Sequence, residues 1–284
     1  MVSGLEHTFY IQDTSARTLV GDILIPFAFD ETMCRKVGEG AAPIVHLWRH
    51  EKALVLGLRD RRLQQAELGM RWLSSQGYQV GVRNSGGAAV PLDPGVLNIS
   101  LIVPNSEGKP NFNVGFERMR QLITESLARF GTGLAQGEVV GSYCPGEYDL
   151  SIDGKKFCGI SQRRQHKAYV VQAFIVVEGH AERRAQMVRM FYEMASGEQL
   201  EEYADGFLVK GVPSPSLDYP HIRQGMMGSL VSLAPGRGIT VRTFAMAVQQ
   251  TLLAWGGLAE RHPQLSSMAE LQQKAAELRT RYDN

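Results

Sequence analysis

Two side chains that could cooperate in nucleophilic chemistry stand close together in the segment GSYCPGEYDLSIDGKKF, residues 141–157. Cys144 directly precedes a Pro-Gly pair, and Lys156 follows twelve positions later. A free thiol ionises near pH ~8.5, and an ammonium group within a few ångströms lowers that pKa because it favours the anion. The two residues could therefore form a thiolate nucleophile and its electrostatic partner. They could equally be an inert thiol and a solvated turn.

Neighbouring residues offer alternatives to this pair. Cys158 stands two positions along the strand from Lys156, so the two side chains could share a strand face. An apolar strand, however, raises the pKa of a thiol and buries it, whereas Cys144 lies in an exposed type of turn. Lys155 is expected to point away from Lys156 on a regular strand, and spacing alone does not choose between the two lysines.

The bulk composition excludes several classes of function. The chain has 284 residues, with 30 Lys and Arg against 29 Asp and Glu, which is not the basic excess of a nucleic-acid-binding domain. The first residues do not resemble a signal peptide, and no apolar stretch is long enough to span a membrane. Three scattered cysteines indicate a reducing compartment, and the absence of CxxC and HExxH argues against a metal site. We expect a soluble cytoplasmic protein without a cofactor or metal ion.

Hydrophobic periodicity predicts alternating strands and helices. The expected helices span 27–40, 66–77, 115–130 and 181–196, and the expected strands lie in 43–60, 78–83, 96–103 and 168–177. Asp153-Gly154 supplies the turn of a hairpin within 148–161, and Ser267 and Glu270 form a capping box for a last helix. Cys34 falls among the apolar positions of the first helix and is interpreted as core. The pattern predicts a mixed α/β fold, with residues 1–284 as a single domain.

A glycine-containing loop, RNSGGAAVPLDPGVLNIS at 83–100, connects two of these strands. Glycines let the backbone approach a ligand closely, although a tight connection between strands would also use them. The loop lacks the Gly-Lys-Ser/Thr of a phosphate-binding Walker loop and does not open a helix in the G-x-G-x-x-G manner. On the glycines alone, a tight connection is favoured over a binding loop.

Three separated motifs resemble those of the lipoate-ligase and octanoyltransferase superfamily. In order along the chain, they are HLWRHEKALVLG at 46–57, the glycine loop with its Asp93, Gly95 and Leu97-Asn98, and DGKKFCGISQRR at 153–164. The resemblance implies a biotin/lipoate-protein-ligase-like fold with mixed sheets flanked by helices. It also implies a catalytic core at 40–215 and a helical C-terminal segment at 216–284. The lysine of the third motif falls on Lys156.

Within the superfamily, RNSGG, VLNISL and GSYCPGEYDLSIDGKKF are similar to the N-octanoyltransferases that use octanoylated glycine-cleavage H protein, also called lipoyl amidotransferases. This resemblance implies that Cys144 carries the acyl group as a thioester and that Lys156 lowers its pKa. The donor would be octanoylated H protein, and the acceptor a lysine of a 2-oxoacid dehydrogenase E2 lipoyl domain. Ala88 and Leu92 replace a glycine and a histidine of the ATP-dependent ligases, which argues against adenylate formation.

Further residues are candidates for binding the octanoyl or lipoyl group. Arg83 and Asn98 are expected to organise the loop and pocket, with Ser85, Gly86 and Gly87 lining it; the alternative is that Arg83 and Asn98 only hold the loop. Three other functions stay open: transfer from octanoyl-acyl-carrier protein, ATP-dependent lipoate ligation, and a non-catalytic module that binds lipoyl domains.

Overall fold

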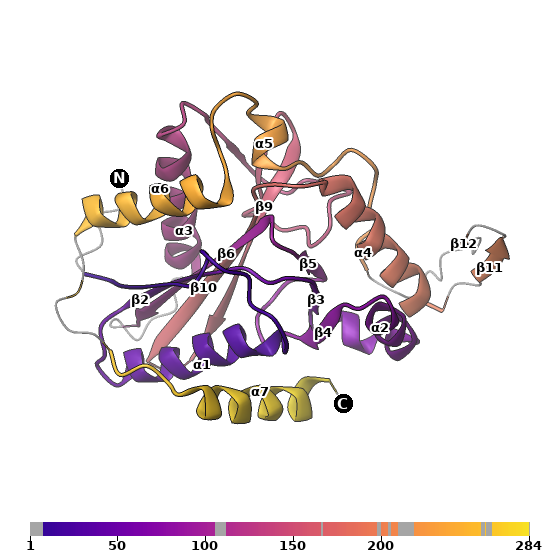
Figure 1. The fold of residues 1–284 in the computed structure, drawn as a ribbon, viewed down its shortest axis with the longest axis horizontal. Coiled ribbons are helices and arrows are strands. Elements are labelled where there is room, and N and C mark those ends of the chain that lie inside the picture. Colours follow the sequence, from indigo (N-terminus) through magenta and orange to yellow (C-terminus); the bar gives the residue numbers. More distant parts are fainter. Residues whose placement is uncertain are drawn as a thin grey trace.

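The computed structural model describes residues 8–105, 112–165, 167–197, 200–203, 206–209, 219–256, 259 and 263–283. In these residues a large and a small sheet lie beside each other, with helices on their outer faces (Figure 1). The architecture is the predicted mixed α/β fold with sheets flanked by helices.

The large sheet has seven strands. In spatial order they are β1 (Tyr10–Asp13), β2 (Ile44–Trp48), β6 (Val96–Pro104), β10 (Ala168–Val176), β9 (Lys155–Arg164), β8 (Leu150–Ile152) and β7 (Ala135–Gln136). Strands β1 and β2 pair in parallel, and all other neighbours are antiparallel. The small sheet has the order β4 (Gln79–Val82), β3 (Ala53–Leu56) and β5 (Val90–Leu92), and β11 (Leu200–Tyr203) pairs with β12 (Gly206–Val209).

The helices cover both faces of the large sheet and one side of the small one. They are α1 (Leu24–Gly38), the 3₁₀ turn η1 (Asp60–Arg62), α2 (Ala66–Ser75), α3 (Phe112–Ala128), α4 (Ala181–Ala195), α5 (Leu230–Leu233), α6 (Val241–Trp255) and α7 (Met268–Tyr282). Helix α7 lies along α1, while α2 and α4 stand beside the small sheet (Figure 1). No described helix is both long and apolar enough to cross a membrane.

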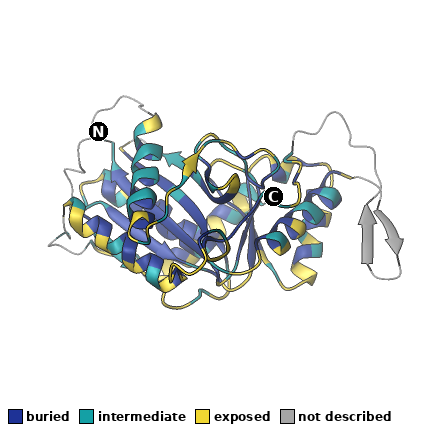
Figure 2. Cartoon of the chain, turned by 90° about the horizontal axis from the view of Figure 1, so that it is seen from above, coloured by how far each residue is buried: buried dark blue, intermediate teal, exposed yellow. Residues whose placement is uncertain are grey.

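Strand β6 shows how the sequence divides the interior. Leu97, Ile99 and Leu101 pack into the core between the large sheet and helices α3 and α6. Because side chains alternate along a strand, Asn98 and Ser100 face the opposite side, where α1 and the small sheet lie. Leu97, Asn98 and Ile99 are nonetheless all buried, because both faces of the sheet are covered (Figure 2). The two polar side chains therefore mark the interior face that holds the site.

Several local predictions are confirmed. Asp153 and Gly154 have φ values of 50° and 74°, which are those of the hairpin turn expected there. Ser267 and Glu270 form the predicted capping box of α7, and Cys34 is fully buried in α1. Helix α1 begins at Leu24 rather than near residue 27, since the Asp22 carboxylate accepts a hydrogen bond from the Leu24 N–H.

The segment predicted to be helical, 216–284, contains α5, α6 and α7 in its described part. Helix α6 packs on α3 and helix α7 on α1, so both helices lie against the core formed by earlier residues. The division of the chain near residue 215, and its treatment as a single domain, stay predictions.

Candidate active site

The glycine loop follows strand β4 and packs against Cys144. Gly87 has φ +94° and packs so tightly that an added Cβ would lie 2.6 Å from Nη2 of Arg83 and 2.8 Å from Sγ of Cys144. Only glycine combines this conformation with this space. The guanidinium of Arg83 donates through Nη1 to Oγ of Ser161 at 3.2 Å and through Nη2 to the Ala88 carbonyl at 2.9 Å. The loop and this arginine therefore form one packed unit.

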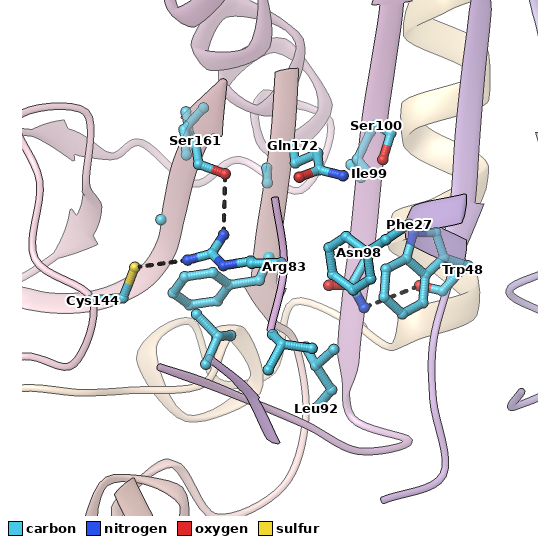
Figure 3. Close-up of a pocket in the computed structure, with 16 residues that line it drawn as sticks. Phe27, Trp48, Arg83, Leu92, Asn98, Ile99, Ser100, Cys144, Ser161 and Gln172 are labelled. Carbon is cyan, nitrogen blue, oxygen red and sulfur yellow. Dashed lines mark hydrogen bonds between the residues drawn. The ribbon is translucent and has the colours of Figure 1, made fainter. Parts of the chain in front are cut away.

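Cys144 lies in a strained turn beside that unit. Its φ of 47° is in the left-handed region, which costs a residue with a side chain about 1–3 kcal/mol. Its Sγ accepts a hydrogen bond from the Ala88 N–H at 3.2 Å. It accepts a second one from Nη2 of Arg83 at 3.4 Å (Figure 3). The residue is only 8% exposed. The sulfur is thus held at a defined place and faces two donors.

Lys156 lies behind the same turn and is fully buried. Its Nζ donates to the carbonyl oxygens of Tyr143 at 2.9 Å and Cys144 at 2.5 Å, and it pairs with Oδ1 of Asp149 at 2.8 Å. The structure therefore brings Lys156 and Cys144 together, with the ammonium against the cysteine's backbone. This contact stabilises the strained turn.

Asp149, which the sequence analysis did not select, completes the turn. Its Oδ2 accepts hydrogen bonds from the N–H groups of Gly146 and Val139 at 3.2 and 3.4 Å. Burial raises the pKa of its carboxyl group, and the Lys156 ammonium and these two amides oppose that rise. A lone aspartate near the start of the expected hairpin gives no sequence signal of this role.

A β-bulge decides which way Lys156 points. Lys156 and Cys158 pair with the consecutive residues Ser151 and Leu150, so Phe157 is the extra residue of strand β9. Phe157 and Cys158 consequently both enter the core beneath α3 and α6, and Lys156 faces the other side. The expectation that Lys156 and Cys158 share a strand face is wrong for this reason. Lys155 is exposed, whereas Lys156 is buried.

The other two thiols are unsuited to nucleophilic attack. Burial raises the pKa of Cys158 well above its usual range, although Lys156 opposes the rise. Burial, followed by the charges of Asp30 and Glu31, raises the pKa of Cys34 to about 12. Both thiols stay protonated at neutral pH.

An apolar cavity opens beside Cys144 and runs between the two sheets (Figure 3). Its cavity volume is about 30 Å³, so its walls lie close together. Its apolar walls are formed mainly by residues of the core on this side of the large sheet: Phe27, Trp48, Val55, Val90, Leu92 and Phe174. Ile99, Ile160 and Ala173 also line it, although their side chains belong to the core on the other side of the sheet. Polar atoms are few, and Asn98 donates to the Trp48 carbonyl at 3.4 Å. Its apolar lining matches the chemistry of an aliphatic group attached to the sulfur, and such a group would have to push the walls apart.

The predicted binding residues divide between this cavity and a neighbouring hollow. Arg83 and Asn98 line the cavity together with Cys144. Ser85, Gly86 and Gly87 instead line the hollow on the outer side of the loop. The loop thus lies between an apolar cavity and a more polar hollow, with the sulfur on the cavity side.

A second layer that the sequence analysis missed holds the loop. The hydroxyl of Tyr192 accepts a hydrogen bond from the Ala89 N–H at 3.0 Å and donates to Oδ1 of Asp60 at 2.9 Å. The other oxygen of Asp60 accepts from the Gly57 N–H at 2.7 Å. These contacts hold Ala89 in place. Ala89 directly follows Ala88, and it is the Ala88 N–H that faces the sulfur.

The aspartate and glycine at the end of the glycine motif have a structural role. Both oxygens of Asp93 accept hydrogen bonds from Arg184 at 2.6 Å, and Asp93 also accepts from the Gly95 N–H. A Cβ on Gly95 would lie 2.5 Å from the Glu178 carbonyl oxygen. The motif therefore ties the β5–β6 connection to α4.

Comparison with known proteins agrees with this architecture. Residues 22–204 match the family of the lipoyl protein ligase A/B catalytic domain, and the chain belongs to this family. It is 40% identical to the octanoyl-GcvH:protein N-octanoyltransferase of Geobacillus kaustophilus over 81% of this chain and 77% of that one. It is 39% identical to the lipoyl-GcvH:protein N-lipoyltransferase of Listeria monocytogenes over 78% and 77% of the two chains.

Solved structures show the same fold. Lipoate-protein ligase A bound with ATP superposes with a TM-score of 0.64 at 18% identity, covering 99% of this chain and 97% of that one. The bipartite lipoate protein ligase of Thermoplasma acidophilum gives 0.65 at 18% identity, with 99% and 94% covered.

Proposed function

We propose that this protein is an acyltransferase that moves an octanoyl or lipoyl group from a lysine of glycine-cleavage H protein to a lysine of an E2 lipoyl domain. The observation that carries the proposal is the place of Cys144, whose sulfur faces two hydrogen-bond donors at the mouth of an apolar cavity. The relatives at about 40% identity are named for transfer from GcvH. Three free cysteines support a reaction in the reducing cytoplasm.

In the first half-reaction the Cys144 thiolate attacks the carbonyl carbon of the donor's octanoyl-lysine amide. A carbon–sulfur bond forms, the carbon–nitrogen bond breaks, and the leaving lysine amine takes up the proton that the thiol had lost. The product is an octanoyl thioester on Cys144 and a free lysine on the donor. Lys156 supports this step by its positive charge and by holding the turn that presents the sulfur.

In the second half-reaction the amine of an acceptor lysine attacks the thioester. The new amide bond forms, the carbon–sulfur bond breaks, and Cys144 leaves as a thiolate while the amine releases a proton. One amide has replaced another, so the overall exchange requires no nucleotide.

Widened by movement of its apolar walls, the cavity supplies affinity for the acyl chain. Burying about seven methylene-sized carbons at ~0.8 kcal/mol each gives a gross gain of about 5–6 kcal/mol before association costs. Phe27, Trp48 and Leu92 provide apolar walls, and Asn98 provides a polar one. The hollow lined by Ser85, Gly86 and Gly87 lies on the outer side of the loop, where a lysine arm could approach the sulfur.

Intact mass spectrometry tests the proposal directly. Incubation with octanoylated H protein should add one octanoyl group to the wild type, and a later addition of apo lipoyl domain should remove it. Cys144→Ala should form no adduct, whereas Cys158→Ala should behave like the wild type because that thiol lies in the opposite core. An unchanged adduct on Cys144→Ala would refute the assignment.

The donor separates this proposal from its nearest alternative. An enzyme of the acyl-carrier-protein type would form the adduct rapidly from octanoyl-acyl-carrier protein and not from H protein. An ATP-dependent ligase would retain activity with ATP and free lipoate after Cys144→Ala. A non-catalytic module would form no adduct with any donor.

A further inference from the structure

Arg83 carries a buried positive charge with no carboxylate against it. Arg83 is only 5% exposed. Among the described residues, its guanidinium forms no ion pair within 4.0 Å. Its hydrogen-bond partners are a hydroxyl, a carbonyl and the sulfur of Cys144. Nε is buried and has no partner. Buried charges are normally paired; the nearby carboxylate of Asp60 interacts with Arg83 only at longer range, so the sulfur is the group in contact that could carry the compensating charge.

Lys156 cannot take the same role by direct contact in this arrangement. An ammonium group has three N–H donors. The three acceptors around Nζ are the carbonyl oxygens of Tyr143 and Cys144 and the carboxylate of Asp149. No donor is left for Sγ, and Asp149 compensates the charge at close range.

The absence of a side chain at Gly87 makes the contact between Arg83 and Cys144 possible. A Cβ there would lie within 3 Å of both Nη2 of Arg83 and Sγ of Cys144. No other described glycine has both a catalytic cation and the nucleophile as its closest neighbours. The loop is therefore shaped around the arginine–sulfur contact.

We propose that the Arg83 guanidinium is the direct counterion of the Cys144 thiolate, and that Lys156 acts mainly by positioning the turn. The inference deepens the proposed function and rests on it for the role of the thiolate in turnover. Two donors, Nη2 and the Ala88 N–H, stabilise the sulfur as a nucleophile in the first half-reaction. They stabilise it again as the leaving group in the second.

Other ionisable groups near Cys144 come from every element packed on it. They are Arg83 after β4, Lys156 on β9, Asp149 before β8, Asp60 in η1, Tyr192 on α4 and the adjacent Tyr143. Burial raises the pKa of both tyrosines, which keeps them neutral at physiological pH. Asp149 is paired with Lys156, so Arg83 is the cation in contact with the sulfur.

The test measures the ionisation of Cys144 without any acyl donor. The rate of alkylation by iodoacetamide, localised to the Cys144 peptide by mass spectrometry, is followed from pH 5 to 10. Arg83→Gln should raise the midpoint by about one unit or more, as expected for loss of a cation in contact, and Arg83→Lys should restore part of that shift. At pH 7 the alkylation rate of Arg83→Gln should fall about tenfold. Arg183→Gln, on the exposed face of α4, is the matched control and should leave the midpoint unchanged.

Gly87→Ala provides a second readout should Arg83→Gln fail to fold. It keeps the arginine but forces it from the sulfur, so it should raise the midpoint as well. A midpoint that is unchanged in Arg83→Gln and Gly87→Ala, but raised in Lys156→Gln, would overturn the inference. Because alkylation needs no protein substrate, a shifted midpoint without octanoyl adducts would refute the proposed function alone.

Discussion

At the level of single residues, the site contains two positive charges with different neighbours. Lys156 is surrounded by two carbonyl oxygens and a carboxylate, and Arg83 contacts the sulfur itself. The ammonium of Lys156 belongs to a structural ion pair. The guanidinium of Arg83 is placed to stabilise negative charge on the sulfur. A cation close to a cysteine in sequence is therefore not necessarily the one that touches its sulfur.

The ion pair between Lys156 and Asp149 leads to a stability prediction. Both side chains are at most 2% exposed, and removing one partner leaves the other charge buried and uncompensated. Asp149→Asn should lower the free energy of unfolding by about 3–5 kcal/mol, measured by urea denaturation.

The control breaks an exposed ion pair. Glu117→Gln removes the pair with Arg120, where both side chains are about a third exposed, and it should cost less than about 1 kcal/mol. A loss in Asp149→Asn as small as in Glu117→Gln would show that the buried pair does not hold the turn.

At the level of elements, the glycine loop packs against Gly57, the residue that directly follows strand β3. An added Cβ on Gly57 would lie 2.0 Å from the Gly87 carbonyl oxygen, which is backbone and cannot rotate away. Gly57→Ala should displace the loop by about an ångström and reduce the acyl-transfer rate about 100-fold.

Gly133→Ala is the matched control for this change, because a Cβ there meets open space. Transfer of octanoyl groups between the two protein substrates is the measurement. Retention of the wild-type rate by Gly57→Ala would mean that the loop is not fixed by its contact with residue 57.

Local elements could be predicted well and the long-range contacts could not. The hairpin at Asp153-Gly154 and the cap at Ser267 follow from side chains within three residues of each other. The bulge at Phe157 left no such trace, because LSIDGKKFCGI is equally compatible with a regular ladder. The contact of Arg83 with Cys144 joins residues 61 positions apart, and only the folded sheets bring them together.

The resemblance to known motifs placed Cys144, Lys156 and Arg83 in one site before any geometry was available. It assigned the cysteine's cation by motif position, however, and it gave no indication of Asp149 or Tyr192. These residues act through the backbone of the turn and loop, and such contacts depend on the path of the chain.

At the level of the whole molecule, buried protonated groups make stability depend on alkaline pH. Burial and two nearby carboxylates raise the pKa of the Cys34 thiol to about 12, well above that of a free thiol. The native state therefore keeps this proton when the unfolded state has lost it. The stabilisation is complete below pH 9 and is lost as the pH rises from 9 towards 12.

This behaviour predicts the slope of stability against pH. Between pH 9 and 11 the wild type should lose about 1.4 kcal/mol per pH unit more than Cys34→Ala, because one fewer proton distinguishes the two states in the variant. Urea denaturation under reducing conditions at several pH values measures the slopes. Parallel slopes would show that Cys34 ionises freely in the native state.

The C-terminal end of helix α7 contacts strand β4, which directly precedes Arg83. The Asp283 carboxylate accepts a hydrogen bond from the Val82 N–H at 2.9 Å, and Arg279 donates to the Val80 carbonyl. Residues made well after Arg83 during translation thus finish the placement of this arginine. A nascent chain that stops before residue 283 would contain all three motifs, but its Arg83 would not yet be held in place beside Cys144. We therefore expect transfer of the acyl group to Cys144 only after synthesis has passed residue 283.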